Sequence, residues 1–302
     1  MSDLRSLMAA ELAKPVNPRV TEMAAALAAE YPGASRAVLF YGSCLREAVL
    51  DGLMLDFYLI VSDYEAAFGK GWFATANRLL PPNVFPYSHK DGEGELAAKY
   101  AVLSEADFAR LCSTAAGDVS VWARFTQPTR LVWQADEAAR AKVEDAVAAA
   151  PVTFATFARP MMDEAALQSG DPLALWGTGF DLTYSAELRA ERKGRSTSIV
   201  DFDPGFYTRL SAALTSDEGR QPILSQGEAA ARWARFRRKG KMLSLARLAK
   251  ATTTYAGGID YIAWKINRHA GTDIAVKDWQ RKWPIVGAIT MLPRLFKSGA
   301  IK

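Results

Sequence analysis

Residues 37–61 read AVLFYGSCLREAVLDGLMLDFYLIV and contain two apolar runs on either side of a glycine-serine turn. The first run, Ala37 to Tyr41, is short and strongly apolar, which indicates a buried strand. The second run, Met54 to Val61, has the same character except for one charged residue, Asp56. This stretch therefore predicts two buried strands joined through a turn, with a single carboxylate on the second strand.

Asp56 is the residue that needs an explanation, because a carboxylate inside an apolar run is costly unless it has a partner. One explanation is a triphosphate site. Gly42 would let the backbone approach the phosphates, Ser43 and the following N–H groups would hold phosphate oxygens, and Asp56 would bind Mg²⁺. The other explanation is structural: a strand, a turn and an edge carboxylate. The residues alone support both equally, since Tyr58 stands where the common Asp-x-Asp pattern has its second carboxylate.

The composition argues against several classes of protein. Half of the 302 residues are hydrophobic, so a sizeable core is expected rather than global disorder. Cys44 and Cys112 are too few for a disulfide framework and lack zinc-site spacing. His89 and His269, the two histidines, argue against a histidine metal site or a His-driven triad. No signal peptide and no apolar run of about 18 residues is visible, so a soluble or peripheral protein is expected.

Helix and strand signals divide the chain into three zones. Residues 1–150 mix both signals and predict an α+β domain in which helices flank a mixed sheet. Residues 151–225, which begin at Pro151, predict a mainly helical second domain, and residues 226–302 predict a basic amphipathic region. In the first zone we expect strands at 37–41, 54–61, 99–103 and 130–133, helices after Asn17-Pro18, between 61 and 81, after Ser104 and at 135–150, and a loop at 86–94.

Five motifs follow one another along the chain: Tyr41-Gly42-Ser43, Met54-Leu55-Asp56-Phe57 with Val61-Ser62-Asp63, residues 99–104 (KYAVLS), 122–128 (WARFTQP) and 182–189 (LTYSAELR). Taken in order, they resemble one family, the mitochondrial translocator-assembly-and-maintenance type of phosphatidate cytidylyltransferase, which makes CDP-diacylglycerol. The resemblance covers about residues 37–266 and implies a nucleotidyltransferase-type fold. Two positions depart from the family pattern: Ser62 replaces one member of an acidic pair, and Phe73 replaces a histidine. The family also lacks the second carboxylate at the Tyr58 position.

The resemblance implies a role for each site residue. The catalytic residues would be Asp56, Ser43 and Lys99, and Mg²⁺ would bind Asp56 and Asp63. The nucleotide would contact Gly42, Ser43, Lys99 and Arg124, and the lipid substrate would contact Tyr184, Glu187 and Arg189. Each assignment has a plain alternative: a solvated strand-edge lysine for Lys99, a helix-terminal charge for Arg124, and a structural salt bridge of Glu187 with Arg189 or Arg192.

The charge of the chain is unevenly distributed. Residues 226–302 hold 16 Lys and Arg against 4 Asp and Glu, whereas the other 225 residues hold 21 against 29. Between 232 and 250 the cations alternate with apolar residues at helical spacing, which is typical of a helix that lies on an anionic membrane surface. The aromatic residues Tyr261, Trp264, Trp279 and Trp283 favour the headgroup region. The alternative is a helix that packs on the protein with solvated arginines. No nucleic-acid motif is present, so we expect no nucleic acid as a partner.

The sequence leads to one main hypothesis and two alternatives. The main one is Mg²⁺-dependent transfer of a cytidylyl group from CTP to phosphatidic acid, on the inner face of a membrane in the cytoplasm of a bacterium. The second is nucleotidyl transfer to another phosphate or alcohol acceptor. The third is a catalytically silent, membrane-associated assembly protein, which the departures at Ser62 and Phe73 favour.

Overall fold

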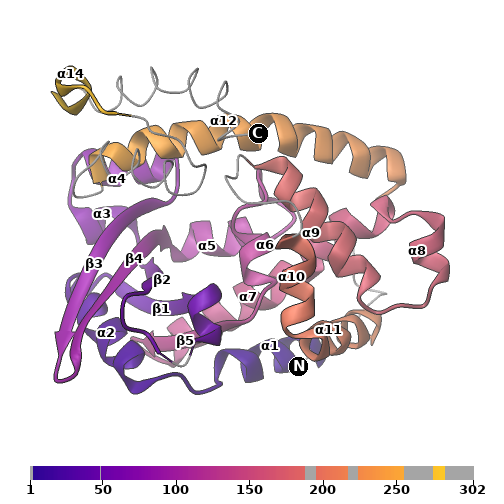
Figure 1. Cartoon of the computed structure of the whole chain (residues 1–302), viewed down its shortest axis with the longest axis horizontal. Coiled ribbons are helices and arrows are strands. Elements are labelled where there is room, and N and C mark those ends of the chain that lie inside the picture. Colours follow the sequence, from indigo (N-terminus) through magenta and orange to yellow (C-terminus); the bar gives the residue numbers. More distant parts are fainter. Residues whose placement is uncertain (1–2, 48, 188–194, 217–223, 255–274, 283–302) are drawn as a thin grey trace.

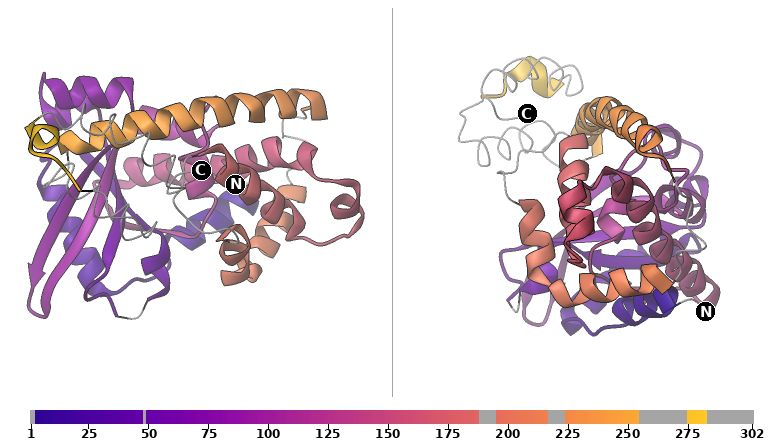
Figure 2. Two further views of the ribbon diagram at one scale, coloured as in Figure 1. Left: turned by 45° about the horizontal axis from the view of Figure 1, so that its top comes forward. Right: turned by 90° about the vertical axis from the view of Figure 1, so that its right-hand side faces the viewer.

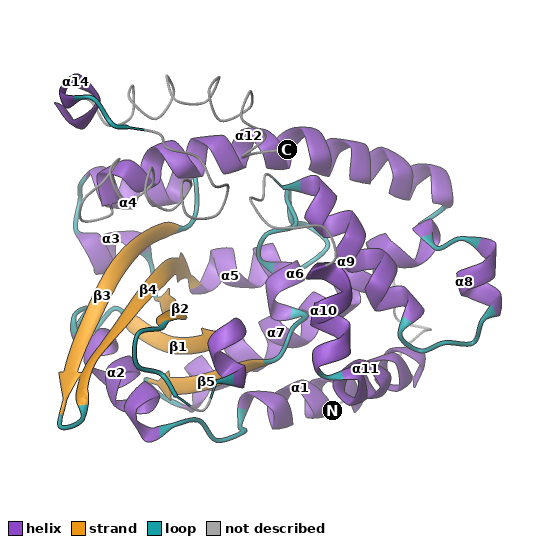
Figure 3. Cartoon of the chain, in the orientation of Figure 1, coloured by secondary structure: helices purple, strands orange, loops and turns teal. Residues whose placement is uncertain are grey.

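The computed structural model describes residues 3–47, 49–187, 195–216, 224–254 and 275–282. Its first part carries a five-stranded sheet with helices on both faces, and its second part is helical (Figures 1 and 3). The sequence prediction of an α+β fold with a mixed sheet and flanking helices, followed by a mainly helical part, is confirmed. The strands are β1 (Ser35–Tyr41), β2 (Met54–Val61), β3 (Asn83–Asp91), β4 (Gly94–Ser104) and β5 (Thr129–Gln134).

The helices follow the same order along the chain. They are α1 (Asp3–Leu12), α2 (Pro18–Ala29), the 3₁₀ turn η1 (Ser43–Arg46), α3 (Tyr64–Phe68), α4 (Trp72–Leu79), α5 (Glu105–Cys112), α6 (Trp122–Phe125), α7 (Glu137–Ala158), the 3₁₀ turn η2 (Arg159–Met161), α8 (Glu164–Gln168), α9 (Ala174–Ala186), α10 (Arg195–Phe202), α11 (Pro204–Ser216), α12 (Gln226–Thr254) and α14 (Asp278–Lys282).

The sheet has the strand order β3-β4-β2-β1-β5. The central pair β2 and β4 is parallel, and the other pairs are antiparallel. Because β1 and β2 are covered on both faces, their sequences are almost continuously apolar rather than alternating. The two faces pack into separate clusters. Leu39, Tyr58 and Ile60 face the helical half of the molecule, while Phe40 and Leu59 face α2, α3 and α4.

Local capping explains where several helices begin. Asn17 accepts a hydrogen bond from the Arg19 N–H at 3.0 Å and opens α2, with Pro18 at the first helical position. Ser104 accepts from the Asp107 N–H at 3.2 Å and opens α5. Both helix starts were predicted from the sequence and are confirmed.

Two sequence expectations about elements are wrong. Residues 86–94 were expected to form a loop, but residues up to Asp91 belong to β3, which pairs with β4 along its length. A proline in a strand is tolerated at a sheet edge, and Pro86 lies on the edge strand β3. The helix expected to stop at Ala150 instead continues through Pro151 to Ala158.

Helix α12 runs along most of the length of the molecule (Figures 1 and 2). It contacts α7 and α9 of the helical part and β3 of the sheet. Trp233 and Phe236 are buried in the same core cluster that holds Ile60 of the sheet and Phe154 of α7. The described residues of all three zones therefore contribute to one core.

Among the described helices, none is long and apolar enough to cross a membrane.

Candidate functional site

The turn after β1 places a glycine against the carboxylate of Asp56. Tyr41, the last residue of β1, pairs with Asp56 of β2, so Gly42 follows at the point where the two strands meet. Gly42 has φ +90°, which residues with a side chain rarely adopt. A Cβ at this position would lie 3.2 Å from Oδ2 of Asp56. Glycine therefore meets two requirements: it accepts the backbone angle and leaves the carboxylate uncovered.

Lys99 is the charged partner of the half-buried Asp56. The parallel register of β2 and β4 places the two residues side by side. Lys99 Nζ lies 2.8 Å from Oδ1 of Asp56, with the lysine side chain 30% exposed and the aspartate side chain 17% exposed. The lysine thus faces the same partly open site as the carboxylate. It is not the solvated strand-edge lysine of the alternative interpretation.

Arg124 of α6 lies close to Tyr41 and Asp56. Its guanidinium carbon lies 4.8 Å from the centre of the Tyr41 ring, an arrangement typical of a cation–π contact. Burial alone would lower the pKa of Arg124, but the acidic groups around it, of which Tyr41, Tyr58 and Asp56 contribute most, raise it instead. Arg124 therefore remains protonated beside Asp56. Its buried Nε has no hydrogen-bond partner.

The other residues predicted to bind the nucleotide or the lipid are Ser43, Tyr184, Glu187 and Arg189. Ser43 begins the 3₁₀ turn after Gly42 and is exposed. Glu187 directly follows α9, and its charge acts on both Arg124 and Tyr58, so it lies near the site. Tyr184 is half-buried and packs against the main core cluster. Arg189 lies outside the described residues.

Asp63 does not lie in this site. Its Oδ1 accepts hydrogen bonds from the N–H groups of Glu65 at 2.8 Å and Ala66 at 2.9 Å, which makes it the N-terminal cap of α3. Asp56 lies near the start of β2 and Asp63 follows two residues after its end, which at about 3.3 Å per residue separates the two by roughly 20 Å. The expectation that both bind one metal ion is therefore wrong, because the strand holds them at its two ends.

Asp56 is the carboxylate that lies against Gly42 and could bind a metal ion. Among the described residues, no group of three or more His, Cys, Asp or Glu side chains lies close enough together to hold a metal. Mg²⁺, however, is commonly bound through one or two carboxylates, with substrate phosphates and water completing its shell. Asp56 fits this role, since Gly42 leaves Oδ2 uncovered on one side. A metal held by protein ligands alone does not fit.

Two residues of α10 lie near the turn and were missed in the sequence. A cavity of about 20 Å³ next to Gly42 is lined in part by Ile199 and Phe202. Both are ordinary apolar residues of an amphipathic helix, so no sequence signal distinguishes them from core positions. The complete lining is Gly42, Leu45, Gln127, Pro128, Ile199 and Phe202.

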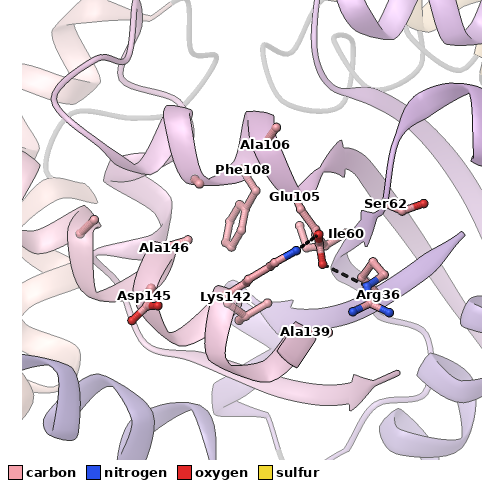
Figure 4. Close-up of a pocket in the computed structure, with 13 residues that line it drawn as sticks. Arg36, Ile60, Ser62, Glu105, Ala106, Phe108, Ala139, Lys142, Asp145 and Ala146 are labelled. Carbon is pink, nitrogen blue, oxygen red and sulfur yellow. Dashed lines mark hydrogen bonds and ion pairs between the residues drawn. The ribbon is translucent and has the colours of Figure 1, made fainter. Parts of the chain in front are cut away.

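A larger cavity lies on another part of the sheet, between α5 and α7 (Figure 4). Its volume is about 550 Å³, and its floor includes Ile60 and Phe108. The charged groups at its rim are all paired: Glu105 contacts Arg36 at 3.0 Å and Lys142 at 2.6 Å, and Asp145 contacts Arg5 at 2.6 Å. Each charged residue that lines this cavity therefore already has a partner.

Comparisons with known proteins give limited information. No protein-family model matches the chain, and no curated protein matches it. The chain is similar to the crystal structure of a nucleotidyltransferase-like protein from Exiguobacterium sibiricum 255-15, with 9% identity and a TM-score of 0.27 over 93% of this chain and 92% of that chain. Both values are low, so this similarity does not establish an activity for the chain.

Proposed function

We propose that the protein transfers a cytidylyl group from CTP to phosphatidic acid, giving CDP-diacylglycerol and pyrophosphate. The observation that carries the proposal is a row of three neighbouring residues: Gly42 directly after β1, Asp56 on β2 and Lys99 on β4. It combines a close backbone approach, a carboxylate and a cation, which are the groups that binding a metal–triphosphate requires. The choice of CTP and of a lipid acceptor rests on the family resemblance of the motifs.

In this proposal each residue of the row has a separate task. Asp56 would hold Mg²⁺ together with phosphate oxygens of the nucleotide, and the ion would neutralise charge on the departing pyrophosphate. Lys99, within 2.8 Å of Asp56, would turn its ammonium group to the triphosphate. Arg124, held in place by Tyr41, would supply a fixed positive charge.

The reaction requires little proton transfer. An oxygen of the lipid phosphate would attack the α-phosphorus of CTP, forming one P–O bond while the bond to pyrophosphate breaks. A phosphomonoester is already an anion near neutral pH, so no strong general base is needed. The site accordingly consists of positioning and charged groups, and it needs no histidine.

The surface of α12 supports a membrane location for the acceptor. Among the described residues, the exposed cations Arg235, Arg238, Lys239 and Lys241 form no ion pair, and Met242 beside them is 67% exposed. Cations near an anionic bilayer each contribute about 1 kcal/mol to binding. The buried Trp233 and Phe236 belong to the protein core, so only the outer face of α12 is available to lipid.

The test is incubation of the protein with CTP, Mg²⁺ and liposomes that contain phosphatidic acid, with CDP-lipid measured by mass spectrometry. Asp56→Asn should abolish the product. Asp63→Asn is the matched control, because it changes a carboxylate that caps α3 and asparagine is an equally good cap. Absence of product with the unaltered protein, or equal losses in both variants, would contradict the proposal. Product formed with a soluble phosphate or alcohol in place of liposomes would identify a different acceptor.

A second candidate is a catalytically silent assembly protein. The observation that favours it is the direct pairing of Asp56 with Lys99, which already satisfies the carboxylate without a metal. Under this hypothesis the pair is structural. Titration calorimetry with CTP and Mg²⁺ separates the two ideas, since a silent protein binds liposomes but shows no heat of nucleotide binding.

A further inference from the structure

A further cavity lies between the end of α7, the segment after α5 and the beginning of α12. Its volume is about 420 Å³, within the usual range for small-molecule sites. Trp233 Nε1 donates to the Phe157 carbonyl at 2.8 Å and fixes α12 against α7 beside it. The lining includes Thr114, Thr156, Phe157, Leu224, Arg232 and Arg235.

The two arginines of this cavity, Arg232 and Arg235, form no ion pair within the described part of the chain. Arg232 Nη2 donates to the carbonyls of Thr114 and Ala116, each at 3.0 Å, but its buried Nε has no partner. Burial, followed by the nearby charge of Arg235, lowers the pKa of Arg232. A cation that is partly removed from water without an anion is costly, and this cost falls when an anion binds.

The nearby acidic residue balances only one of the two arginines. Glu228 lines the same cavity, and hydrogen bonds to its Oε2 from Ser225 N at 2.9 Å and Ser225 Oγ at 2.6 Å lower its pKa, so it is negatively charged. The cavity in Figure 4 is different, because there Glu105 contacts both Arg36 and Lys142. Among its described lining residues, the cavity between α7 and α12 therefore carries two positive charges against one negative charge.

The rest of the lining includes apolar residues: Leu224, Ala231 and Phe157, whose ring centre lies 5.4 Å from the guanidinium carbon of Arg232. An arginine pair is well suited to a phosphate group, which the guanidinium binds through two parallel hydrogen bonds. We propose that this cavity binds a phosphate group attached to an apolar body, with the phosphate at Arg232 and Arg235 and the apolar part on Phe157 and Leu224. The site is separate from the row at Asp56 and does not depend on the proposed reaction.

The test measures binding of dihexanoyl phosphatidic acid and of inorganic phosphate by calorimetry, using the full chain. Arg235→Gln removes a cation of the cavity that makes no structural contact, so the fold should be retained. Arg209→Gln removes an exposed cation of α11 that does not line the cavity. All proteins are compared in a Lys99→Met background, so that the site at Asp56 contributes little to binding.

We expect Arg235→Gln to weaken binding of the short-chain lipid about tenfold, as for loss of one charged hydrogen bond, and Arg209→Gln to leave it unchanged. Inorganic phosphate should bind more weakly than the lipid. Equal effects of the two substitutions would show attraction by overall charge and overturn the proposal. Phosphate that binds as tightly as the lipid would overturn the apolar half of it. Because each comparison is made without turnover, failure of the cytidylyl-transfer proposal leaves this result unaffected.

Discussion

At the scale of single residues, Gly42 can be compared with a matched glycine. Gly42 and Gly52 both have positive φ, +90° and +74°, but a Cβ on Gly52 would meet nothing within 4 Å. We expect alanine at either position to lower the free energy of unfolding by about 1–2 kcal/mol, the cost of a left-handed backbone for a residue with a side chain. Only Gly42→Ala should also weaken nucleotide binding, because only its methyl group lies against Asp56. Urea unfolding and calorimetry measure the two effects; equal nucleotide affinities would contradict the proposed role of Gly42.

The sequence identified Asp56 as a residue in need of a partner but could not identify the partner by spacing. Lys99 comes from a strand far along the chain, and only the parallel register of β2 and β4 brings its ammonium group to the carboxylate. The family resemblance named Lys99 and Arg124 without their geometry. The same resemblance failed for Asp63 as a metal ligand, because a residue at the far end of β2 caps a helix there. A motif gives the order of residues along the chain, whereas this site depends on which strands lie side by side in the sheet.

At the scale of elements, strongly apolar strands were predictable and polar ones were not. Strands β1 and β2 are buried on both faces, so their sequences are unmistakable. Strand β3 lies at the edge of the sheet, and its polar residues and Pro86 are also typical of a loop. The amphipathic pattern of α12 was also recognised, but a pattern cannot say what covers the apolar face. Burial of Trp233 and Phe236 shows that the protein itself covers that part.

Helix α12 is held at its other end by a buried lysine, which predicts a pH dependence. Lys250 Nζ donates to the carbonyls of Leu80 and Pro82, and burial, followed by the charge of Arg247, lowers its pKa from 10.5 to about 7. Between these two pH values the unfolded chain binds more protons than the folded protein, so stability rises with pH, by up to about 1.4 kcal/mol per unit.

In Lys250→Met this contribution should disappear. We expect the difference in unfolding free energy between the original protein and Lys250→Met to change steadily in favour of the original protein from pH 7.5 to 9.5, as measured by urea denaturation. Subtracting the two removes the titration of other groups. The exposed residue Lys241 supplies the control, since Lys241→Met should show no such trend. A constant difference across this range would mean that Lys250 stays charged in the folded protein.

At the scale of the whole molecule, α12 connects the sheet to the helical part. Towards the sheet, Arg247 forms an ion pair with Asp118 at 3.1 Å and donates to the Pro81 carbonyl at 2.9 Å. Towards the helical part, Trp233 is buried against Phe157 and Trp122. The basic helix α12 therefore holds the two parts of the molecule together and also presents a charged surface. A change at its middle should affect the end of α9, where Glu187 lies near Arg124.

Two glycines of α12 test this connection, because the same substitution should have opposite effects. A Cβ on Gly240 would clash with the carbonyl oxygen of Ala186, the last residue of α9, whereas a Cβ on Gly227 would meet nothing within 4 Å. Gly227→Ala should raise the free energy of unfolding by up to about 1 kcal/mol, since alanine favours a helix over glycine. Gly240→Ala should lower it by about 1–3 kcal/mol, the usual cost of overpacking, and should reduce nucleotide affinity through the displaced Glu187. Urea unfolding and calorimetry on both variants check this. If Gly240→Ala is as stable and as competent as Gly227→Ala, α12 does not rest on the end of α9, and its link to the site at Asp56 is lost.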